Sequence, residues 1–426
     1  MPNDTIFALS SGAPPAAIAV LRISGPDAER VLTQLIGGTL PEPRRASLRL
    51  LRGLDGALLD QALVLRFPSP ATATGEDMAE LHCHGGRAVV AAIEQALEAL
   101  GCRRAEPGEF TRRAFLNGRM DLAEAEGLAD LLAAETELQR QAAIGLAEGR
   151  FSAQVEGWRQ EVLRLSAIVE AALDFADDDD VTGLPQSFAE DAATLAEELT
   201  RWLDRPRAER LKEGVRVVIA GPPNSGKSTL FNALLEDEAA IISPEAGTTR
   251  DALERHVAIG GVPFTFVDTA GLREEGAGAI EAIGITRAQQ HIARADLVLW
   301  LGPEGSGPAG ALEVESKIDE SCHQAKHGPD HRVSGVTGQG VDQLKRDLVE
   351  RTRYLFPKPG QLALNERQAR LVSAARDSLK QIASSVDELV IAEHLRQTRL
   401  AFDSLLGRVA TEDMLDALFG RFCIGK

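Results

Sequence analysis

The sequence is poor in aromatic residues and in cysteine. It has one tyrosine and three tryptophans in 426 residues, which argues against an aromatic platform of the kind on which nucleic-acid bases stack. The four cysteines are Cys83, Cys102, Cys322 and Cys423, and none stands in a CxxC pair. The chain is therefore not a disulfide scaffold, and reduced thiols fit a cytosolic protein.

Long apolar runs and a signal segment are also missing. The longest apolar runs, such as "VRVVIA" and "DLVLWL", are far shorter than the roughly 20 residues that span a bilayer. The opening "MPNDTIFALSS" lacks a basic n-region and so does not resemble a secretory signal. We therefore expect a cytoplasmic protein with no membrane association.

Positive charge is scarce overall. The formal net charge of −18 argues against nucleic-acid binding through bulk charge. Local arginine pairs still occur, at 44–45, 103–104 and 112–113, and a local basic patch remains compatible with this composition.

The length predicts two to three domains. Residues 1–117 mix β-like runs, "AIAVLRIS" (17–24) and "QALVLRF" (61–67), with turn signals and one helix at 86–101 that ends at Gly101. This segment is typical of an α+β domain.

Two segments with helical periodicity follow, at 118–210 and 357–426. Apolar residues recur at three-four spacing in both, which predicts one buried stripe for each. The first stripe is Leu122, Ala125, Ala129 and Leu132, in a pattern that continues to Phe175, and the second is Leu371, Ala374, Ile382, Val386 and Leu389. Between them, residues 211–356 alternate strands and helices, which predicts an α/β domain with a parallel sheet inserted into a helical domain.

A phosphate-binding pattern opens the inserted domain. "GPPNSGKS" (221–228) fits G-x-x-x-x-G-K-[ST] and lies between a buried strand and a helix, the context in which this pattern is specific. Backbone N–H groups of residues 224–229 would cradle the phosphates at a helix N-terminus. Lys227 would reach the β- and γ-phosphates, and the Ser228 hydroxyl would ligate Mg²⁺.

Two later loops complete the phosphate side of the site. "DTAG" (268–271) follows a strand, which makes Asp268 the acid of the Mg²⁺ shell and lets the Gly271 N–H sense the γ-phosphate. "GTTRD" (247–251) supplies a threonine for Mg²⁺. Many GTPases place glutamine after the DTAG glycine to orient the attacking water. Leu272 has no polar atom, so another group, with Glu281 as the candidate, must orient the water.

The base-recognition loop departs from the usual Asn-Lys-x-Asp pattern. In "ESKIDE", Ser316 stands where asparagine is expected, while Lys317 can flank the base and the Asp319 carboxylate can accept two hydrogen bonds from guanine. Ser334 and Gly335 would form the last loop at the base edge. A P-loop ATPase with a degraded base loop remains an alternative.

Three stretches together resemble the MnmE (TrmE) family of tRNA modification GTPases. They are "PGEFTRRAFLNGRMDLAEAEGLADLL" (107–132), the combination of "GPPNSGKSTLFNALL", "AGTTRD" and "DTAGLRE", and the terminal "FCIGK". The resemblance extends over essentially the whole chain, including the opening "DTIFAL" and "IAVLRISG".

The resemblance implies three kinds of domain. Residues 1–117 would be an α+β tetrahydrofolate-binding and dimerisation domain. Residues 118–210 and 357–426 would form an all-α helical domain, and 211–356 an inserted α/β P-loop (Ras-like) G domain. Its nucleotide-binding residues would be Asn224, Ser225, Gly226, Lys227, Ser228, Thr229, Ser243, Pro244, Glu245, Ala246, Gly247, Thr248, Thr249, Asp268, Thr269, Ala270, Gly271, Ser316, Lys317, Asp319, Ser334 and Gly335.

The resemblance also implies ions and a cofactor. Thr249 would join Ser228 on Mg²⁺, and Glu281 would orient water. Potassium, supplying charge in place of an arginine finger, would bind Asn224, Ser243, Glu245 and Thr248. A tetrahydrofolate derivative, 5-formyl or 5,10-methylene, would contact Arg22, Glu80, Arg119 and Lys426.

The implied activity is K⁺-activated GTP hydrolysis that serves modification of the wobble uridine of certain tRNAs. A carboxymethylaminomethyl or aminomethyl group would be added at C5 with a folate-carried one-carbon unit. The homodimer would join an FAD-dependent partner of the MnmG (GidA) type in a heterotetramer, and the partner would use FAD and NADH. The alternative is a regulatory or assembly GTPase without modification chemistry, for which the "GEFTRRAFLNGR" block has no use.

The terminal "RFCIGK" admits three interpretations. A prenylation box is disfavoured because lysine is a poor last residue and Gly425 is not aliphatic. A frayed tail would leave Phe422 and Ile424 exposed without a reason. We favour docking, in which a last helix runs to about Gly420, Phe422 anchors the tail, and Lys426 borders the folate. Cys423 would then act as nucleophile or general acid, unless burial alone explains the cysteine.

Overall fold

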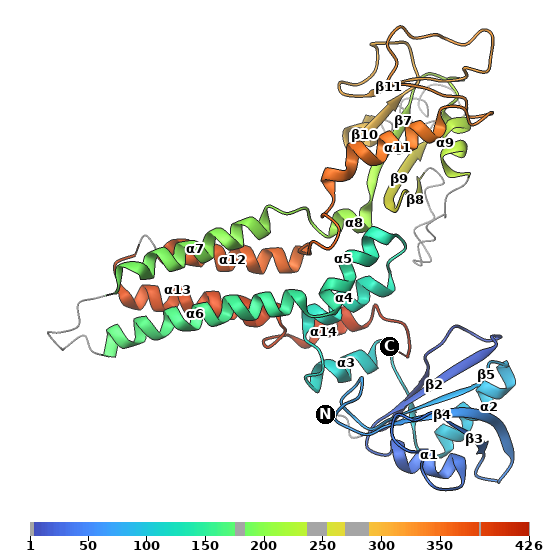
Figure 1. Cartoon of the computed structure of the whole chain (residues 1–426), viewed down its shortest axis with the longest axis vertical. Coiled ribbons are helices and arrows are strands. Elements are labelled where there is room, and N and C mark those ends of the chain that lie inside the picture. Colours follow the sequence, from blue (N-terminus) through green and yellow to red (C-terminus); the bar gives the residue numbers. More distant parts are fainter. Residues whose placement is uncertain (1–3, 175–183, 237–253, 269–288, 383–384, 426) are drawn as a thin grey trace, which may run out of the picture. The chain divides into compact units, whose positions relative to one another are not determined.

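The computed structural model describes residues 4–174, 184–236, 254–268, 289–382 and 385–425 (Figure 1). The chain forms two compact units. The first comprises residues 1–129, 146–160 and 399–426, and the second comprises residues 130–145 and 161–398.

The first unit contains a six-stranded sheet in the order β3-β4-β5-β2-β1-β6. All neighbours are antiparallel except β1 and β6. The strands expected at 17–24 and 61–67 are confirmed as β2 and β4. The elements are β1 (Ile6–Leu9), β2 (Ile18–Ser24), α1 (Ala28–Ile36), β3 (Ser47–Arg52), β4 (Leu58–Phe67), β5 (Met78–His84), α2 (Arg87–Ala99), β6 (Arg103–Arg104) and α3 (Glu109–Leu116).

Alternation along the strands divides this sheet into two faces. Leu21, Ile23 and Leu81 point to one face, where they pack into the same buried core as Val31 of α1 and Ile93 of α2. The opposite face carries the alternate residues of β2 and β5, including the paired positions 22 and 80. The helix expected at 86–101 is confirmed as α2, and Gly101 follows it in a left-handed conformation (φ 88°).

Helices make up most of the remaining chain outside the second sheet. In the second unit, α7 and α12 pack against each other along their lengths. The helices are α4 (Leu122–Leu132), α5 (Glu137–Ala147), α6 (Arg150–Asp174), α7 (Gln186–Leu203), α8 (Glu209–Glu213), α12 (Glu366–Ile382), α13 (Glu388–Leu405) and α14 (Glu412–Phe419).

Two of the expected apolar stripes need correction. In α4, Leu122 and Ala125 are buried, but Leu132 at the end of the helix is 48% exposed. The stripe 371–389 is wrong in two respects. Within α12, Leu371 and Ala374 do not belong to the buried face. Because α12 ends at Ile382, the helical phase also does not continue to Val386 and Leu389, which are 100% and 68% exposed. The buried face of α12 is instead Gln368, Ala369, Val372, Ala375, Leu379 and Ile382.

The second sheet has the order β12-β11-β10-β7-β9-β8. All pairs are parallel except β8 with β9, which confirms the α/β prediction. Its elements are β7 (Val215–Ala220), α9 (Lys227–Leu235), β8 (Glu254–Ile259), β9 (Val262–Asp268), β10 (Leu297–Trp300), β11 (Leu312–Glu315), β12 (His331–Arg332), α11 (Val341–Thr352) and the 3₁₀ turn η2 (Arg353–Leu355).

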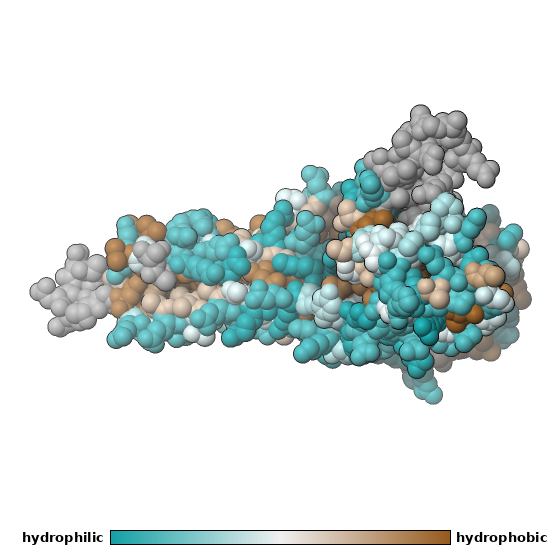
Figure 2. Space-filling view, turned by 90° about the horizontal axis from the view of Figure 1, so that it is seen from above, coloured by the Kyte–Doolittle hydropathy of each residue, from teal (hydrophilic) through white to brown (hydrophobic). Residues whose placement is uncertain are grey.

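The central strand β7 is almost completely buried. Val217 and Ile219 contribute to a core with Leu230 of α9 and Leu344 of α11. This packing fixes the carboxyl end of β7, where the phosphate-binding loop begins. Most of the surface visible in Figure 2 is hydrophilic, with apolar residues in small groups. Among the helices of the described residues, none combines the length and apolarity needed to cross a bilayer.

Candidate functional site

The loop between β7 and α9 has the backbone geometry of an anion-binding turn. Gly221, Asn224 and Gly226 all have positive φ values, of 155°, 60° and 87°. A side chain at Gly221 would stand 3.1 Å from the Leu301 carbonyl carbon, so the close approach of the two loops requires glycine there. The turn leads directly into α9. The first N–H groups of this helix have no partner within the helix and can bind an anion.

The first residues of α9 carry the polar groups of the site. Lys227 is 7% exposed, and its Nζ donates a hydrogen bond to the Pro222 carbonyl at 2.7 Å. Ser228 Oγ donates to Asp268 Oδ2 at 2.8 Å. A hydroxyl and a carboxylate held side by side at the ends of α9 and β9 are hard oxygen ligands that suit Mg²⁺.

The strand β11, which is separated from β7 by β10 in the sheet, supplies the loop expected at the base. Ser316 follows β11, and its Oγ donates to the Ser225 carbonyl at 2.7 Å, so this residue ties the base loop to the phosphate loop. Lys317 adopts a left-handed conformation (φ 61°). A hydrogen bond from the Ser334 side chain is the main cause that lowers the pKa of Asp319. This hydrogen bond favours the carboxylate form, which can accept hydrogen bonds from two donors.

Gly335 has a steric explanation. A Cβ at this position would lie 2.8 Å from the carbonyl carbon of Thr229 and 2.9 Å from the Leu230 nitrogen, both in the backbone of α9. The Ser334–Gly335 loop therefore sits directly against the helix that begins at the phosphate loop. An alanine at 335 would force the loop and α9 apart.

We expect Ser316→Asn to bind guanine nucleotides about two- to tenfold more tightly. The serine hydroxyl is already engaged by the Ser225 carbonyl, whereas an amide has further donor and acceptor capacity, and one added hydrogen bond contributes about 0.5–1.5 kcal/mol. Competition of GDP against a fluorescent GDP analogue measures the change. Ser316→Ala serves as control and should weaken binding. Equal or weaker binding by the asparagine variant would show that the loop is adapted to serine.

Several expected site residues lie outside the described residues. They are Ser243, Pro244, Glu245, Ala246, Gly247, Thr248, Thr249, Thr269, Ala270, Gly271, Glu281 and Lys426.

A second polar constellation lies on the N-terminal sheet. Arg22 and Glu80 are paired across β2 and β5, and two arginine nitrogens donate to Glu80 Oε1 at 3.0 and 2.8 Å. Glu80 Oε2 lies 3.3 Å from His82 Nε2. The Arg22 guanidinium also stacks over the ring of Phe110, 5.9 Å from its centre. Arg119 is exposed near Gly75.

The two histidines of β5, His82 and His84, have carboxylate neighbours. His84 Nδ1 lies 2.7 Å from Asp60 Oδ1, and His82 faces Glu80. Within the described residues, no group of three or more His, Cys, Asp and Glu side chains is arranged for one metal ion.

Sequence reasoning missed the most buried ionic cluster of the first unit. Arg113 is 3% exposed, and its guanidinium contacts Asp4 (2.7 Å), Glu109 (3.0 Å) and Glu76 (3.1 Å). Glu76 in turn accepts from Ser24 Oγ at 2.8 Å. The signal available in the sequence was the i,i+4 pair of Glu109 and Arg113 inside "GEFTRRAFLNGR".

The C-terminal tail docks as expected. α14 ends at Phe419, and Phe422 is 5% exposed in a cluster with Leu122 and Leu415. Beyond Phe422, Pro107 and Ile424 form an antiparallel bridge, and Ser10 Oγ donates to the Gly425 carbonyl at 3.0 Å. Cys423 is exposed, so the explanation of this cysteine by burial is wrong.

Comparison with known proteins shows to which proteins the chain is related. A family model described as the MnmE helical domain matches residues 122–423, and one described as the GTP-binding protein TrmE N-terminus matches residues 5–119. A tRNA modification GTPase MnmE of Erythrobacter litoralis is 61% identical and covers 99% of this chain and 100% of the relative. Proteins of the same name from Novosphingobium aromaticivorans and Rhizorhabdus wittichii are 58% and 55% identical. Each covers 100% of this chain, and 100% and 97% of the respective relative.

Proposed function

We propose a function for this chain from its membership of the MnmE family of tRNA modification GTPases. It hydrolyses GTP, and this hydrolysis supports modification of the wobble uridine of tRNA at C5. The observation that carries this proposal is the joint placement of Lys227, Ser228 and Asp268 around the N-terminus of α9. These groups provide one cation and two oxygen ligands next to backbone N–H donors. That arrangement binds a nucleoside triphosphate with Mg²⁺.

Each group has a defined part in hydrolysis. Lys227 would neutralise charge on the β- and γ-phosphates, and Ser228 and Asp268 would hold Mg²⁺ through their side-chain oxygens. Bound Mg²⁺ would offset the charge that develops on the phosphoryl oxygens. Glu281 is proposed to orient the water because Leu272 has no polar atom.

We propose that the base loop selects guanine. Asp319 accepts two N–H groups of the base, and the Ser334–Gly335 loop closes over its edge. Ser316 supports this arrangement indirectly through the Ser225 carbonyl.

Potassium is proposed as the source of the remaining positive charge. Asn224, held at φ 60° in the phosphate loop, would ligate the ion together with Ser243, Glu245 and Thr248. We propose that the loop around the ion closes when two G domains meet, so hydrolysis should also rise with protein concentration.

The proposal predicts a cation-dependent rate of GTP turnover. We expect the rate in K⁺ to exceed the rate in Na⁺ of equal ionic strength by about tenfold or more, since an electrostatic stabiliser of the transition state is typically worth at least that much. Steady-state phosphate release at several protein concentrations checks this. Rb⁺, which is close to K⁺ in size, is the matched control and should activate. Equal rates in K⁺ and Na⁺ would remove potassium from the mechanism.

The N-terminal unit is proposed to bind a tetrahydrofolate derivative, 5-formyl or 5,10-methylene. Glu80 offers a carboxylate to the donor edge of a pterin, and the cations Arg22, Arg119 and Lys426 suit the glutamyl carboxylates. The folate would supply the one-carbon unit. An FAD-containing partner of the MnmG type, which draws on NADH, would carry out the redox step.

The same sheet face supports a homodimer. Leu48 and Leu63 are cross-strand neighbours, and Leu63 is paired with His82, so all three lie on the face that carries Arg22 and Glu80. Leu48 and Leu63 are 58% and 38% exposed, and Ile18 on the same face is 59% exposed. Adjacent exposed apolar side chains of this kind mark an interaction surface. We propose that two copies pair here and join two partner subunits in a heterotetramer.

The docked tail yields a further prediction. Deleting residues 423–426 should weaken binding of 5-formyltetrahydrofolate by about 10- to 100-fold, since a hydrogen bond to a charged group contributes about 1.5–3 kcal/mol. Isothermal titration calorimetry measures the binding. Cys423→Ser is the matched variant. It should retain folate binding but lose tRNA modification if the exposed thiol acts chemically, while GTP hydrolysis stays unchanged in both proteins. Unaltered folate binding by the truncated chain would contradict the role of the tail.

A further inference from the structure

A basic groove lies in the second unit, and none of the residues that line it belongs to the nucleotide loops. It has a volume of about 650 Å³ and is formed by the end of α7 and the segment that follows α11. Four cations line it: Arg201, Arg205, Arg353 and Lys358. Asp204 is the one acidic residue in the lining. A concentration of positive charge is notable in a chain whose formal net charge is −18.

In the described part of the chain, three of the four groove cations lack the carboxylate partners that other arginines of the unit have, and the fourth, Arg205, has Glu198 as a charged neighbour. Arg164 and Arg210, for example, pair with carboxylates at 2.5 and 3.0 Å. Within the described residues, the side chains of Arg201, Arg353 and Lys358 form no ion pair or hydrogen bond. Their charge is therefore not neutralised within this part of the protein and remains available to an anion.

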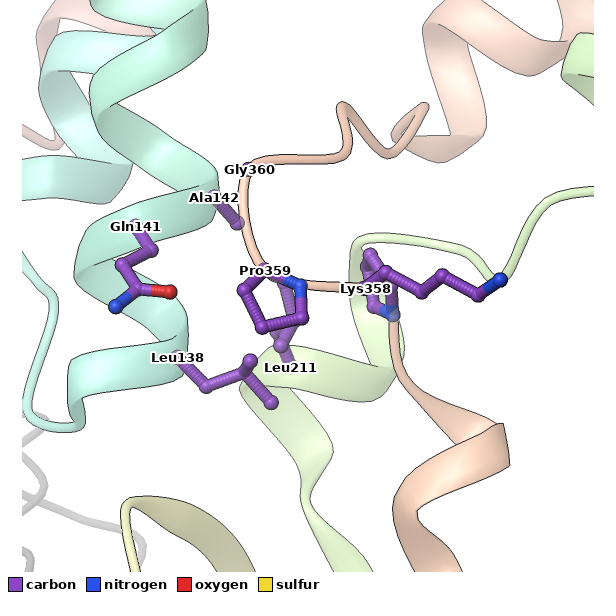
Figure 3. A pocket seen from close by; sticks show the side chains of 8 residues that line it. Leu138, Gln141, Ala142, Leu211, Lys358, Pro359 and Gly360 are labelled. Carbon is purple, nitrogen blue, oxygen red and sulfur yellow. The ribbon is translucent and has the colours of Figure 1, made fainter.

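The walls of the groove are anchored, which holds these charges in place. Figure 3 shows Pro359 facing Leu138 and Ala142 of α5, whereas Lys358 extends away from that helix. Phe356, four per cent exposed, fixes the start of the same segment.

The opposite wall is held by an aromatic contact. The Arg205 guanidinium lies 3.7 Å from the centre of the Trp202 ring, and Trp202 is 6% exposed. Burial lowers the pKa of Arg205, although the group stays protonated. A partly desolvated cation of this kind binds an anion more strongly than a fully hydrated one.

The groove also presents the only tyrosine of the sequence. Tyr354 lines it and is 78% exposed. An exposed aromatic ring among guanidinium groups is the combination with which proteins stack unpaired bases and bind the flanking phosphates. A protein with an acidic surface would satisfy the cations but would leave the exposed ring unexplained.

We propose that this groove binds the phosphate backbone of the RNA substrate and stacks one unpaired base on Tyr354. The inference rests on the proposed function, because it assigns a docking surface to the tRNA named there. Since the formal net charge of the chain is −18, binding of RNA through bulk charge is disfavoured, and a local basic groove then determines where the RNA docks.

The test compares RNA binding by the full chain and by two double variants. Arg201→Ala/Arg353→Ala removes two groove cations, whereas Arg346→Ala/Arg370→Ala removes two exposed arginines that do not line the groove. Binding of an unmodified tRNA is measured by fluorescence anisotropy between 50 and 250 mM KCl. We expect the groove variant to bind about 10- to 100-fold more weakly near 0.1 M salt, with a slope of log K against log [salt] smaller by roughly two. The control variant should match the wild type.

Two substitutions of Tyr354 distinguish base stacking from general charge attraction as the cause of RNA binding. Tyr354→Phe should retain affinity, and Tyr354→Ala should lose about 1–3 kcal/mol, or roughly 5- to 150-fold. GTP hydrolysis without RNA should be unchanged in all variants, which verifies the fold.

The outcomes distinguish this inference from the function on which it rests. Wild-type affinity and an unchanged salt slope in the groove variant would overturn the groove alone. A groove variant that binds tRNA normally but no longer binds the FAD-containing partner would assign the surface to that protein and also overturn the inference. If the wild-type chain, alone and with its partner, binds no tRNA, both the proposed substrate and the groove assignment fail.

Discussion

Replacing Arg113 by methionine is expected to lower the free energy of unfolding of the N-terminal sheet by about 3–5 kcal/mol, the usual cost of removing one partner from a buried ionic cluster. Arg113 is 3% exposed and joins Asp4, Glu76 and Glu109, which come from three separate parts of the chain. Without the guanidinium, Glu76 and Glu109 would remain as partly buried carboxylates close to each other, and their charges would repel.

The neighbouring Arg112→Met provides the matched control. Arg112 pairs with Glu412 and Asp416, whose side chains are 81% and 61% exposed, and exposed pairs of this kind contribute about 0–1 kcal/mol. Native-state hydrogen exchange of the amides of β2 and β5 measures the local stability. Exchange should be at least about 100-fold faster in the Arg113 variant, since 1.4 kcal/mol corresponds to a factor of ten. Equal protection in the two variants would mean that the cluster does not stabilise the sheet.

The same cluster should make the sheet sensitive to acid. Burial works against ionisation of Asp4 and Glu109, but hydrogen bonds from Arg103 and Arg113 outweigh burial and lower the pKa of both carboxyls. Their contribution to stability is therefore present above the unfolded-state pKa, near 4, and is lost as the pH falls through the lower folded-state pKa.

The second large effect concerns Lys227→Ala, which we expect to slow GTP hydrolysis by about 10²–10³-fold. Lys227 is buried at the start of α9, and its Nζ is held 2.7 Å from the Pro222 carbonyl, beside the N–H groups that face the phosphates. A positioned cation acts on charge that develops in the transition state, and removal of one such stabiliser typically costs this factor.

A lysine in the same unit supplies the control for this experiment. Lys212 is 54% exposed and pairs with Asp130 at 2.7 Å, so Lys212→Ala should hydrolyse GTP at the wild-type rate. Steady-state turnover in K⁺ is measured for both proteins. A Lys227 variant that retains more than a third of the wild-type rate would remove this residue from the catalytic machinery.

The sequence predicted best where periodicity and local chemistry agree. The run "VRVVIA" and the glycines after it determine β7 and the phosphate loop, because both depend on neighbours within about ten residues. The predicted apolar stripe from Leu371 to Leu389 failed because periodicity and the local structure disagree there. Its residues continue the helical spacing, yet α12 stops at Ile382 and the next helix starts at Glu388.

In the candidate sites, too, residues whose role depends on near neighbours in the sequence were predictable, and residues whose role depends on distant segments were not. Lys227 and Ser228 are identified by their spacing alone. The burial of Arg113 is not, because it depends on Asp4 and Glu76, which reach it only through the tertiary fold. The groove around Tyr354 likewise combines the ends of two segments that are about 150 residues apart in the sequence.

The pairing of α7 with α12 has a consequence for synthesis of the chain. Ala208 N donates to the Leu364 carbonyl at 3.1 Å. The segment before α12 therefore returns to the segment after α7, once the ribosome has synthesised all strands of the second sheet. Roughly 160 residues separate the end of α7 from the start of α12. At about 5–20 residues per second, α7 waits roughly 10–30 s for its partner helix. During that interval its apolar face, with Phe188, Leu195 and Leu199, is exposed on the ribosome, while the inserted α/β segment has time to fold first.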